Sequence, residues 1–441
     1  MTELKRKLSR FDLIMIAVGS TIGSGIFLTP ALIAQQLPSP MWILGIWILG
    51  GLVALAGGLT YAELGAMFPE AGGVYVFIRK AYGELPGFLY GWSYFVVTNT
   101  GGIAALSIAF STYFGYFIPL SSAGTLIVAI AGIVLVTVVN ILGVKAGGIF
   151  SDLFTVLKLL GIIFLIVVGL FWGSSSTTDY SQSLGNLPNG LGSALTLAFV
   201  SILWSYGGWQ HATFTAGEAK NPRRDMPISL IAGTVIVTAL YILINVCYMM
   251  LLSPSQMASS SRVASDAIST VLGPVGGTII AITIFISTFG TTGIYTLTAP
   301  RIYYAMARDG IFFKKVAEIH PRFGTPIYAI LFQSFWAICL ILFWGTFESL
   351  ISYVVFTDWI FFGLTGLSVL IFRKKLPNAE RPYRTLGYPI VPIFFVVISF
   401  LFVGYTLFEK PTEALAGLFF LGAGVLFYFI HRRRKRSATL V

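Results

Sequence analysis

Glycines and small polar residues interrupt two hydrophobic stretches of this sequence. Residues 19–30 read GSTIGSGIFLTP, and residues 203–210 read LWSYGGWQ. An unpaired backbone N–H or C=O costs several kcal/mol in hydrocarbon, so a membrane helix breaks only where it lines a cavity or faces protein. Freed N–H groups and the positive end of a half-helix suit a carboxylate, and freed C=O groups suit an ammonium. Together the two stretches could bind a zwitterion, such as a free amino acid, through backbone alone.

A lysine lies within a third apolar stretch, TVLKLLGII at residues 155–163. A lysine at the centre of a membrane span costs about 2.5–3.5 kcal/mol on insertion scales. Its long side chain could extend to the membrane surface instead. Because ionisable residues inside membrane spans are mostly functional, we expect Lys158 to act in the mechanism.

The composition shows which elements must position these residues. The chain has 441 residues, of which 56% are hydrophobic and 10% are charged, whereas soluble domains carry about 25% charged residues. Runs of roughly 20 apolar residues predict membrane-spanning helices. The sequence therefore predicts an all-α integral membrane protein with about twelve transmembrane helices, near residues 11–36, 41–67, 85–116, 124–142, 150–172, 190–217, 226–252, 272–306, 326–345, 347–372, 387–408 and 412–430.

The charge distribution predicts the orientation in the membrane. The formal net charge is +11. If the spans alternate in direction, nearly all of the 28 lysines and arginines fall on the side of the N-terminus. The positive-inside rule then places both termini in the cytoplasm. The basic character therefore marks orientation and does not indicate nucleic-acid binding, although the tail at 431–441 could also contact anionic lipid headgroups.

The two glycine-interrupted spans are the first and the sixth. Because they lie five spans apart, an odd number, the two halves of the chain enter the membrane from opposite sides. This pattern predicts a 5+5 inverted repeat with broken helices 1 and 6. The predicted single domain, 1–441, comprises a first repeat at 11–172, a second at 190–372, two additional helices at 387–430 and a basic cytoplasmic tail at 431–441. For either stretch alone, close helix packing through small residues is the alternative.

Several motifs along the chain resemble those of a known family. They are GSTIGSGIF, YAELGAMFPEAGGVYVFIRKAYG (61–83), FTVLKLLG (154–161), WSYGGW, EAKNPRRDMP (218–227), RIYYAMARDG (301–310) and ERPYRTLGYPIVP (380–392). The sequence is similar to the amino acid–polyamine–organocation (APC) superfamily. Within it, the chain resembles the L-type amino acid transporter (LAT) family, notably its bacterial alanine–serine–cysteine exchangers. The resemblance implies a LeuT-type fold, alternating access and no cofactor.

The resemblance also implies a substrate site at the two breaks, with Ser20, Thr21, Gly23, Ser24, Gly25, Trp204, Ser205 and Gly207. The N–H groups of Ser24 and Gly25 would hold the carboxylate. The carbonyls of Thr21, Trp204 and Gly207 would hold the amino group, with Trp204 as an aromatic gate.

Lys158 resembles the lysine that replaces a sodium ion in sodium-independent relatives. It would reach Gly19 in the first span and the hydroxyls of Thr291 or Thr292 in the eighth. Proton coupling through Lys158 stays open at this point.

The expected function is sodium-independent exchange of small neutral L-amino acids, of the alanine, serine and cysteine type, across the plasma membrane. A proton-coupled symporter is one alternative. A carrier of cationic amino acids is another, because the buried acid Asp358 in the tenth span could favour a positive side chain or could simply form a structural hydrogen bond.

Other classes of protein and of partner fit less well. A channel would show a repeated filter or rings of pore charges. His211, His320 and His431 show no catalytic or metal-ligand spacing, so we expect neither an enzyme nor a metal site. Cys247 and Cys339 lie in apolar spans, and the loop at 117–124, FIPLSSAG, lacks the cysteine with which LAT light subunits bond a heavy subunit. We therefore expect no disulfide-linked heavy subunit.

Overall fold

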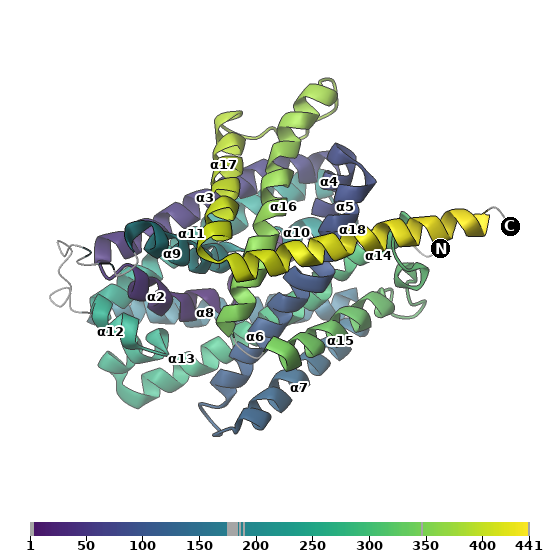
Figure 1. The fold of residues 1–441 in the computed structure, drawn as a ribbon. Helices are drawn as coiled ribbons and strands as arrows, with labels where there is room; N and C mark the ends of the chain where they lie inside the picture. Colours follow the sequence, from purple (N-terminus) through teal and green to yellow (C-terminus); the bar gives the residue numbers. More distant parts are fainter. Residues whose placement is uncertain (1–3, 174–183, 185–186, 188–189, 345–346, 440–441) are drawn as a thin grey trace.

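The computed structural model describes residues 4–173, 184, 187, 190–344 and 347–439. Within this part the regular structure is helical (Figure 1). The helices that build the first half are α1 (Arg10–Thr21), α2 (Gly25–Gln36), α3 (Pro40–Met67), α4 (Val74–Tyr82), α5 (Glu84–Ser93), the π-helical turn η1 (Tyr94–Thr98), α6 (Asn99–Phe114), α7 (Ser122–Ile141) and α8 (Val144–Trp172).

The second half repeats this use of long and interrupted helices. Its elements are α9 (Gly190–Tyr206), α10 (His211–Phe214), η3 (Ala216–Glu218), α11 (Pro222–Leu251), α12 (Pro254–Ser259), α13 (Val263–Thr298), α14 (Pro300–Arg308), η4 (Lys314–Ala317), α15 (Ile327–Trp344), α16 (Phe347–Lys375), α17 (Ile390–Glu409) and α18 (Pro411–Thr439).

The predicted membrane spans correspond to these helices in order. Among the described residues, 10 helical segments are long and apolar enough to cross a membrane, and two shorter apolar helices, Gly190–Tyr206 and Ile327–Phe343, match the sixth and ninth predicted spans. The all-α membrane fold with interrupted first and sixth spans is therefore confirmed. The division into repeats at 11–172 and 190–372 stays a prediction.

The eighth span begins close to where the sequence predicts, near residue 272, and a short helix precedes it. The element α13 begins at Val263 and is kinked at Gly273. Gly273 has a φ of 59° inside this element, and Pro274 follows it. A positive φ is easily adopted only by glycine, and proline is favoured at the first position of a helix. The two residues thus end one short helix and begin the span itself, an arrangement that hydropathy alone does not reveal.

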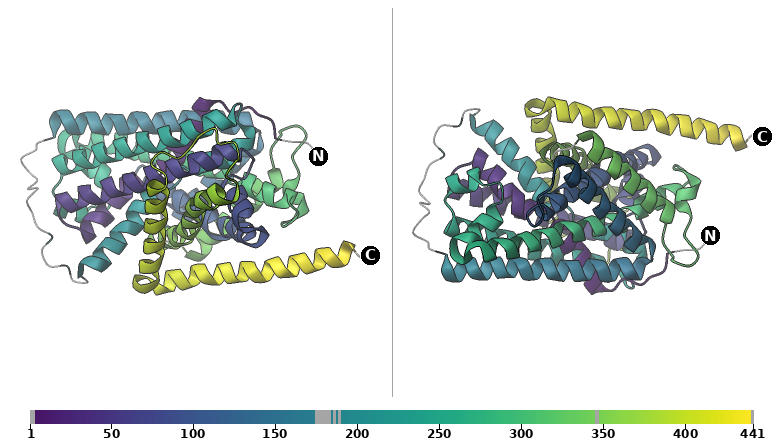
Figure 2. Two further views of the ribbon diagram at one scale, coloured as in Figure 1. Left: turned by 90° about the horizontal axis from the view of Figure 1, so that it is seen from above. Right: turned by 90° about the horizontal axis from the view of Figure 1, so that it is seen from below.

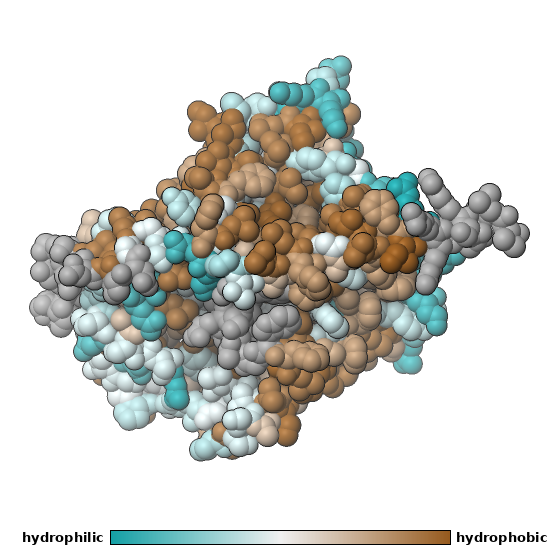
Figure 3. Space-filling view, viewed as in Figure 1, coloured by the Kyte–Doolittle hydropathy of each residue, from teal (hydrophilic) through white to brown (hydrophobic). Residues whose placement is uncertain are grey.

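The outer surface of the bundle carries many exposed apolar side chains. Phe343 and Phe408 have exposed fractions of 82% and 85%, and hydrophobic residues cover much of the face over α16, α17 and α18 (Figure 3). Such a surface suits hydrocarbon rather than water. Both termini lie at the same end of the bundle in all views (Figures 1 and 2), as an even number of spans requires.

The last residues that the structure describes remain helical. The sequence predicts a separate basic tail from residue 431, whereas α18 continues to Thr439. Arg432 donates a hydrogen bond to the hydroxyl of Tyr428, 3.0 Å away, one turn earlier. Basic residues are good helix formers and interact favourably with the C-terminal end of a helix dipole.

The N-terminal segment is fastened to the chain just after the second broken helix. The N–H groups of Lys7 and Leu8 donate to the carbonyl of Glu218, and the N–H of Lys220 donates to the carbonyl of Leu8. Arg10 adds an ion pair to Asp225 at 2.9 Å. The start of α1 and the start of α11 are therefore joined at the end of the bundle that carries both termini.

Candidate functional site

The first break separates α1 from α2. Helix α1 ends at Thr21, and α2 begins at Gly25. Ile22 leaves the helical region with ψ at 86°, and the side chain of Ser24 makes no capping hydrogen bond to α2. The first N–H groups of a helix have no partner within the helix. The break thus presents donors from the start of α2 and acceptors from the end of α1, both inside the bundle.

The second break separates α9 from α10. Gly208 has a φ of 120°, in the region that favours glycine. Its N–H donates to Oε1 of Gln210 at 2.9 Å. Its carbonyl accepts from the N–H of His211 at 2.9 Å and from the hydroxyl of Ser20 at 2.8 Å. The last contact joins the second break directly to the first.

The two breaks pack against each other without intervening side chains. A Cβ atom on Gly208 would lie 2.4 Å from the carbonyl oxygen of Ser20, and one on Gly25 would lie 2.7 Å from the Cα of Ser205. The hydroxyls of Thr29 and Ser205 are 2.7 Å apart. Glycine at positions 25 and 208 is thus what permits the two backbones to meet.

Lys158 lies between the first break and α13, with no exposed surface. Its Nζ atom is 2.9 Å from the carbonyl oxygen of Gly19 and 2.7 Å from that of Ile22. It is also 3.2 Å from the carbonyl oxygen of Ser287 and 2.6 Å from Oγ1 of Thr291. An ammonium has three donors, so four acceptors at these distances fully surround it. The charge lies inside the bundle and does not extend to the membrane surface.

Hydroxyl groups of α13 complete this cluster. The hydroxyl of Ser287 lies 3.0 Å from the carbonyl oxygen of Gly23, and Oγ1 of Thr291 lies 2.9 Å from that of Ile22. The sequence names Thr291 and Thr292 as partners of Lys158. The structure brings Thr291 to the lysine, whereas the hydroxyl of Thr292 donates to the carbonyl of Thr288.

Sequence reasoning did not identify the tyrosines of α11 that bind the broken first span. The hydroxyl of Tyr241 donates to the carbonyl of Thr21 at 3.0 Å, and that of Tyr248 donates to the carbonyl of Ile26 at 3.3 Å. These tyrosines are seven residues apart and so lie on one face of the helix. Their spacing is the signal that could have revealed them.

The substrate residues predicted from the sequence all lie at the meeting of the two breaks, but their atoms differ in availability. The carbonyl of Thr21 already accepts from Tyr241 and from the N–H of Gly23. The hydroxyl of Ser20 is bound to Gly208. The hydroxyl of Ser24, in contrast, is buried without a hydrogen-bond partner. Of these three groups, the hydroxyl of Ser24 at the start of α2 is therefore the one available to bind a ligand.

A small cavity borders the second break. It measures about 20 Å³, and its lining includes Trp204, Gly207, Gly208, His211 and Asp358. A space of this size holds about one water molecule. The structure therefore leaves little space beside the second break, and Trp204 borders that space.

His211 belongs to a hydrogen-bond chain at this cavity. Its Nδ1 is 2.6 Å from the hydroxyl of Thr298, which itself donates to the carbonyl of Ile294. Because that hydroxyl has one proton, it accepts from the Nδ1–H of the histidine. Nε2 then accepts from the hydroxyl of Tyr94 at 2.8 Å. Both ring nitrogens are satisfied in the neutral ring.

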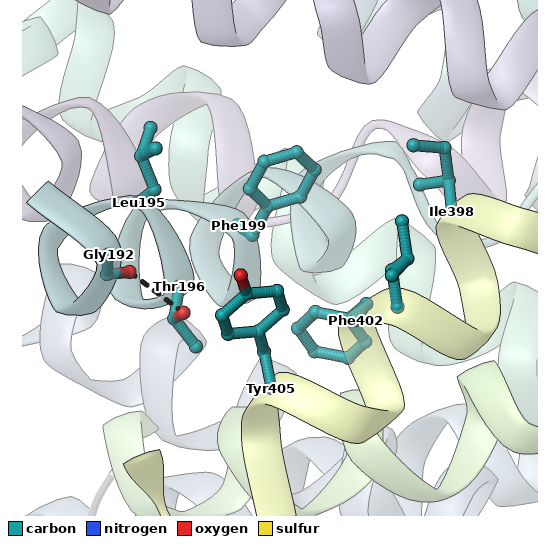
Figure 4. Close-up of a pocket in the computed structure, with 8 residues that line it drawn as sticks. Gly192, Leu195, Thr196, Phe199, Ile398, Phe402 and Tyr405 are labelled. Atoms are coloured by element: carbon teal, nitrogen blue, oxygen red, sulfur yellow. Dashed lines mark hydrogen bonds between the residues drawn. The ribbon is translucent and has the colours of Figure 1, made fainter. Parts of the chain in front are cut away.

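A larger pocket lies between α9 and α17 (Figure 4). It measures about 200 Å³ and is lined mostly by apolar side chains, including Leu195, Phe199, Ile398 and Phe402. The hydroxyl of Thr196, on its wall, donates to the carbonyl of Gly192. This lining offers no charged group to a zwitterion, so the pocket does not compete with the breaks as the substrate site.

Comparisons with known proteins identify the family. The model of the family described as amino acid permease matches residues 8–429. The chain is 32% identical over 438 residues to the serine/threonine exchanger SteT of Bacillus subtilis, covering 98% of each chain. It is 32% identical to the human b(0,+)-type amino acid transporter 1, covering 97% of this chain and 88% of the relative.

A third relative extends this pattern to a transporter subunit. The human large neutral amino acids transporter small subunit 2 is 31% identical, with 97% of this chain and 80% of the relative covered. These matches span both breaks, Lys158 and α13. The resemblance expected from the motifs is confirmed: the chain belongs to the amino acid permease family, and it is a multi-pass membrane protein of amino acid transport.

Proposed function

We propose that this protein exchanges small neutral L-amino acids, of the alanine, serine and cysteine type, one for one and without sodium, by alternating access. The observation that carries the proposal is the position of Lys158. Its ammonium binds carbonyls of the first break and the hydroxyl of Thr291 on α13. Carbonyl and hydroxyl oxygens are also the ligands that hard cations prefer, so a fixed ammonium supplies the positive charge that a bound ion would bring.

The breaks supply the two ends of the substrate site. The N–H groups of Ser24 and Gly25, at the positive end of α2, suit the carboxylate. The carbonyls of Trp204 and Gly207 suit the amino group, with Trp204 closing over the bound molecule. The cavity beside the second break is only about 20 Å³, so it must widen to admit a substrate, and short side chains require the least additional space.

The setting of the protein forms part of the same proposal. We place it in the plasma membrane with both termini in the cytoplasm, in contact with lipid and without a disulfide-linked heavy subunit. The excess of basic residues in the expected inner segments supports this orientation. Cys247 is buried and Cys339 is partly buried, which supports a chain that works without a covalent partner.

Counterflow in proteoliposomes tests the function. Labelled alanine uptake is measured with and without internal alanine, with and without sodium, and with and without a proton gradient. We expect uptake to require internal amino acid and to ignore both ions. Uptake into empty vesicles driven by an inward proton gradient would replace exchange with proton symport.

The substitution Lys158→Ala tests the role of the lysine. It removes an ammonium that contacts three buried carbonyls and the hydroxyl of Thr291. A hydrogen bond to a charged group contributes about 1.5–3 kcal/mol, so we expect at least about a hundredfold loss of counterflow. Lys145→Ala is the matched control, because Lys145 lies on the same helix with its side chain exposed. Wild-type counterflow in Lys158→Ala would exclude the lysine as the substitute for an ion.

A further inference from the structure

Two cavities lie at the end of the bundle that carries both termini, and Arg6 lines each of them. Their volumes are similar, about 450 and 470 Å³. Acids balance the charge of the smaller cavity. Its lining includes Glu70 and Asp309, and Asp309 forms an ion pair with Arg79 at 2.6 Å. The cations of the smaller cavity thus have partners within the protein.

The larger cavity, here called the basic cavity, is not balanced in this way. No acid is among the described residues that line it, and its four cations are Arg6, Lys220, Arg223 and Arg224. Arg223 pairs with Glu380 at 2.8 Å, but the two side chains are 61% and 71% exposed, and exposed pairs contribute little. Within the described part of the chain, no acid forms an ion pair with the other three cations. Clustered charges of one sign around a cavity favour an anion inside it.

The four cations come from two segments of the chain. Arg6 belongs to the N-terminal segment, and the other three belong to the start of α11 and the residues just before it. Backbone hydrogen bonds of Lys7, Leu8 and Lys220 hold the two segments side by side. Asn221, the N-cap of α11, makes no side-chain capping bond and lines the same cavity, so the positive end of a helix dipole adds to the cations. An anion in the basic cavity would contact both segments at once.

The position of the basic cavity relative to the membrane indicates the source of the anion. The cavity lies just beyond the end of α3, at Pro69, and at the start of α11, at Pro222. These two long apolar helices pack against each other and carry exposed apolar side chains such as Leu52 and Val235, which suit contact with lipid. The cavity is therefore at the level where spans leave the hydrocarbon and phospholipid headgroups begin.

We propose that the basic cavity is a phosphate-binding site that joins the N-terminal segment to the start of α11. Arginine and lysine bind phosphate oxygens through charge-assisted hydrogen bonds. The place of the cavity at the membrane surface favours an anionic phospholipid headgroup as the ligand, and free phosphate offers the same chemistry. Because the ligand contacts both segments, it stabilises the fastened arrangement of α1. The site is separate from the two breaks, and its test does not require transport.

Direct binding tests the site and distinguishes the two sources of phosphate. Purified protein in an uncharged detergent is titrated at one ionic strength with dihexanoyl phosphatidylglycerol, dihexanoyl phosphatidylcholine and inorganic phosphate. We expect phosphatidylglycerol to bind at least about tenfold more tightly than phosphatidylcholine, whose choline cancels the phosphate charge. Tightest binding by inorganic phosphate would retain the site and assign the free ion as its ligand. Equal binding of the two lipids, with none of inorganic phosphate, would show that acyl chains are recognised instead and would overturn the inference.

Charge-removing variants locate the binding. Each basic residue near an anionic surface contributes a factor of about five, so Lys220→Gln combined with Arg224→Gln should weaken phosphatidylglycerol binding by about twentyfold or more. Lys314→Gln combined with Arg322→Gln is the matched control, because it removes the same residue types from exposed positions outside the cavity lining. Size-exclusion profiles check that both double variants are folded. Equal losses in the two would assign the attraction to the overall surface charge and contradict the site.

Hydrogen exchange tests the link between the two segments. A ligand that binds only the fastened state lowers the population of the open state in proportion to its saturation. At ten times the dissociation constant of phosphatidylglycerol, the amides of Leu8 and Lys220 should therefore exchange about tenfold more slowly. Arg6→Gln, which removes the cavity cation of the N-terminal segment, should weaken binding by about fivefold. Unchanged exchange with bound lipid, or unchanged affinity in Arg6→Gln, would refute the joining role.

Discussion

The two breaks satisfy their freed backbone polar groups in different ways. In the first, the freed carbonyls of Gly19, Ile22 and Gly23 are held by Lys158, Ser287 and Thr291. In the second, Gly208 satisfies its own polar groups locally and against Ser20, and a cavity borders it. The first break is fixed by a cation and hydroxyls from neighbouring helices, whereas the second keeps space beside it.

We infer from this difference that the two breaks have different roles in transport. A break whose acceptors are all occupied holds its geometry while the substrate comes and goes. A break that borders a cavity can accept a ligand and let an adjacent aromatic side chain move. The comparison predicts that substitutions at the contact between the breaks act on both, whereas substitutions around Lys158 act through the first break alone.

The largest effect is expected at the contact itself, from Gly208→Ala. The new Cβ would lie 2.4 Å from the carbonyl oxygen of Ser20, at a φ of 120° that disfavours any other residue. Steric overlap and backbone strain of a few kcal/mol should lower alanine counterflow by at least about a hundredfold.

Gly192→Ala is the control for this substitution, because a Cβ there has no atom within 4 Å and the residue lies on α9, the helix that leads into the second break. Size-exclusion profiles of both variants check that each is folded. Normal counterflow in Gly208→Ala would show that the two breaks separate more easily than their packing indicates.

An intermediate effect is expected from Thr291→Val, which removes the hydroxyl 2.6 Å from Nζ of Lys158. Loss of a hydrogen bond to a charged group should reduce counterflow by about tenfold. Thr292→Val changes the adjacent residue by the same atoms, but the hydroxyl of Thr292 donates to the carbonyl of Thr288 on its own helix. Equal losses in the two variants would refute a specific role for the lysine cluster.

The smallest effect is expected from Tyr241→Phe, which frees one lone pair of the Thr21 carbonyl. A neutral hydrogen bond contributes about 1 kcal/mol, so the apparent affinity for alanine should change by about fivefold. Tyr248→Phe serves as the control, since its longer bond, 3.3 Å, reaches Ile26 beyond the break. A greater change in Tyr248→Phe would move the functional part of the broken span toward α2.

Much of the arrangement follows from local sequence signals. Gly23 and Gly25 mark the first break, and Gly207 and Gly208 mark the second. At both places glycines with small polar neighbours interrupt an otherwise apolar run. Lys158 can also be recognised from the sequence as a candidate site residue. It is a charged residue within an apolar stretch, and such a charge needs polar partners inside the membrane. Hydropathy and glycine content together therefore predict the fold class and the region of the candidate site.

The remaining contacts depend on rotations that sequence does not encode locally. Thr291 and Thr292 have the same side chain, yet about 100° of helix rotation separates them, and only the packing of α13 decides which one faces Lys158. The sequence also cannot show that the carbonyls of Ile22 and Ser287 contact Lys158, because every residue has a carbonyl. The sequence likewise does not show that Oδ1 of Asp358 is without a hydrogen-bond partner among the described residues.

The fastening of the N-terminal segment has a kinetic consequence. Any movement of α1 away from residues 218–225 must break three backbone hydrogen bonds and the Arg10–Asp225 ion pair, each hydrogen bond worth about 1 kcal/mol net. Those bonds would add to the barrier for opening the inner side without touching the substrate. Changes at Leu8, which is buried, should therefore alter the turnover rate and its temperature dependence more than the affinity for the transported amino acid.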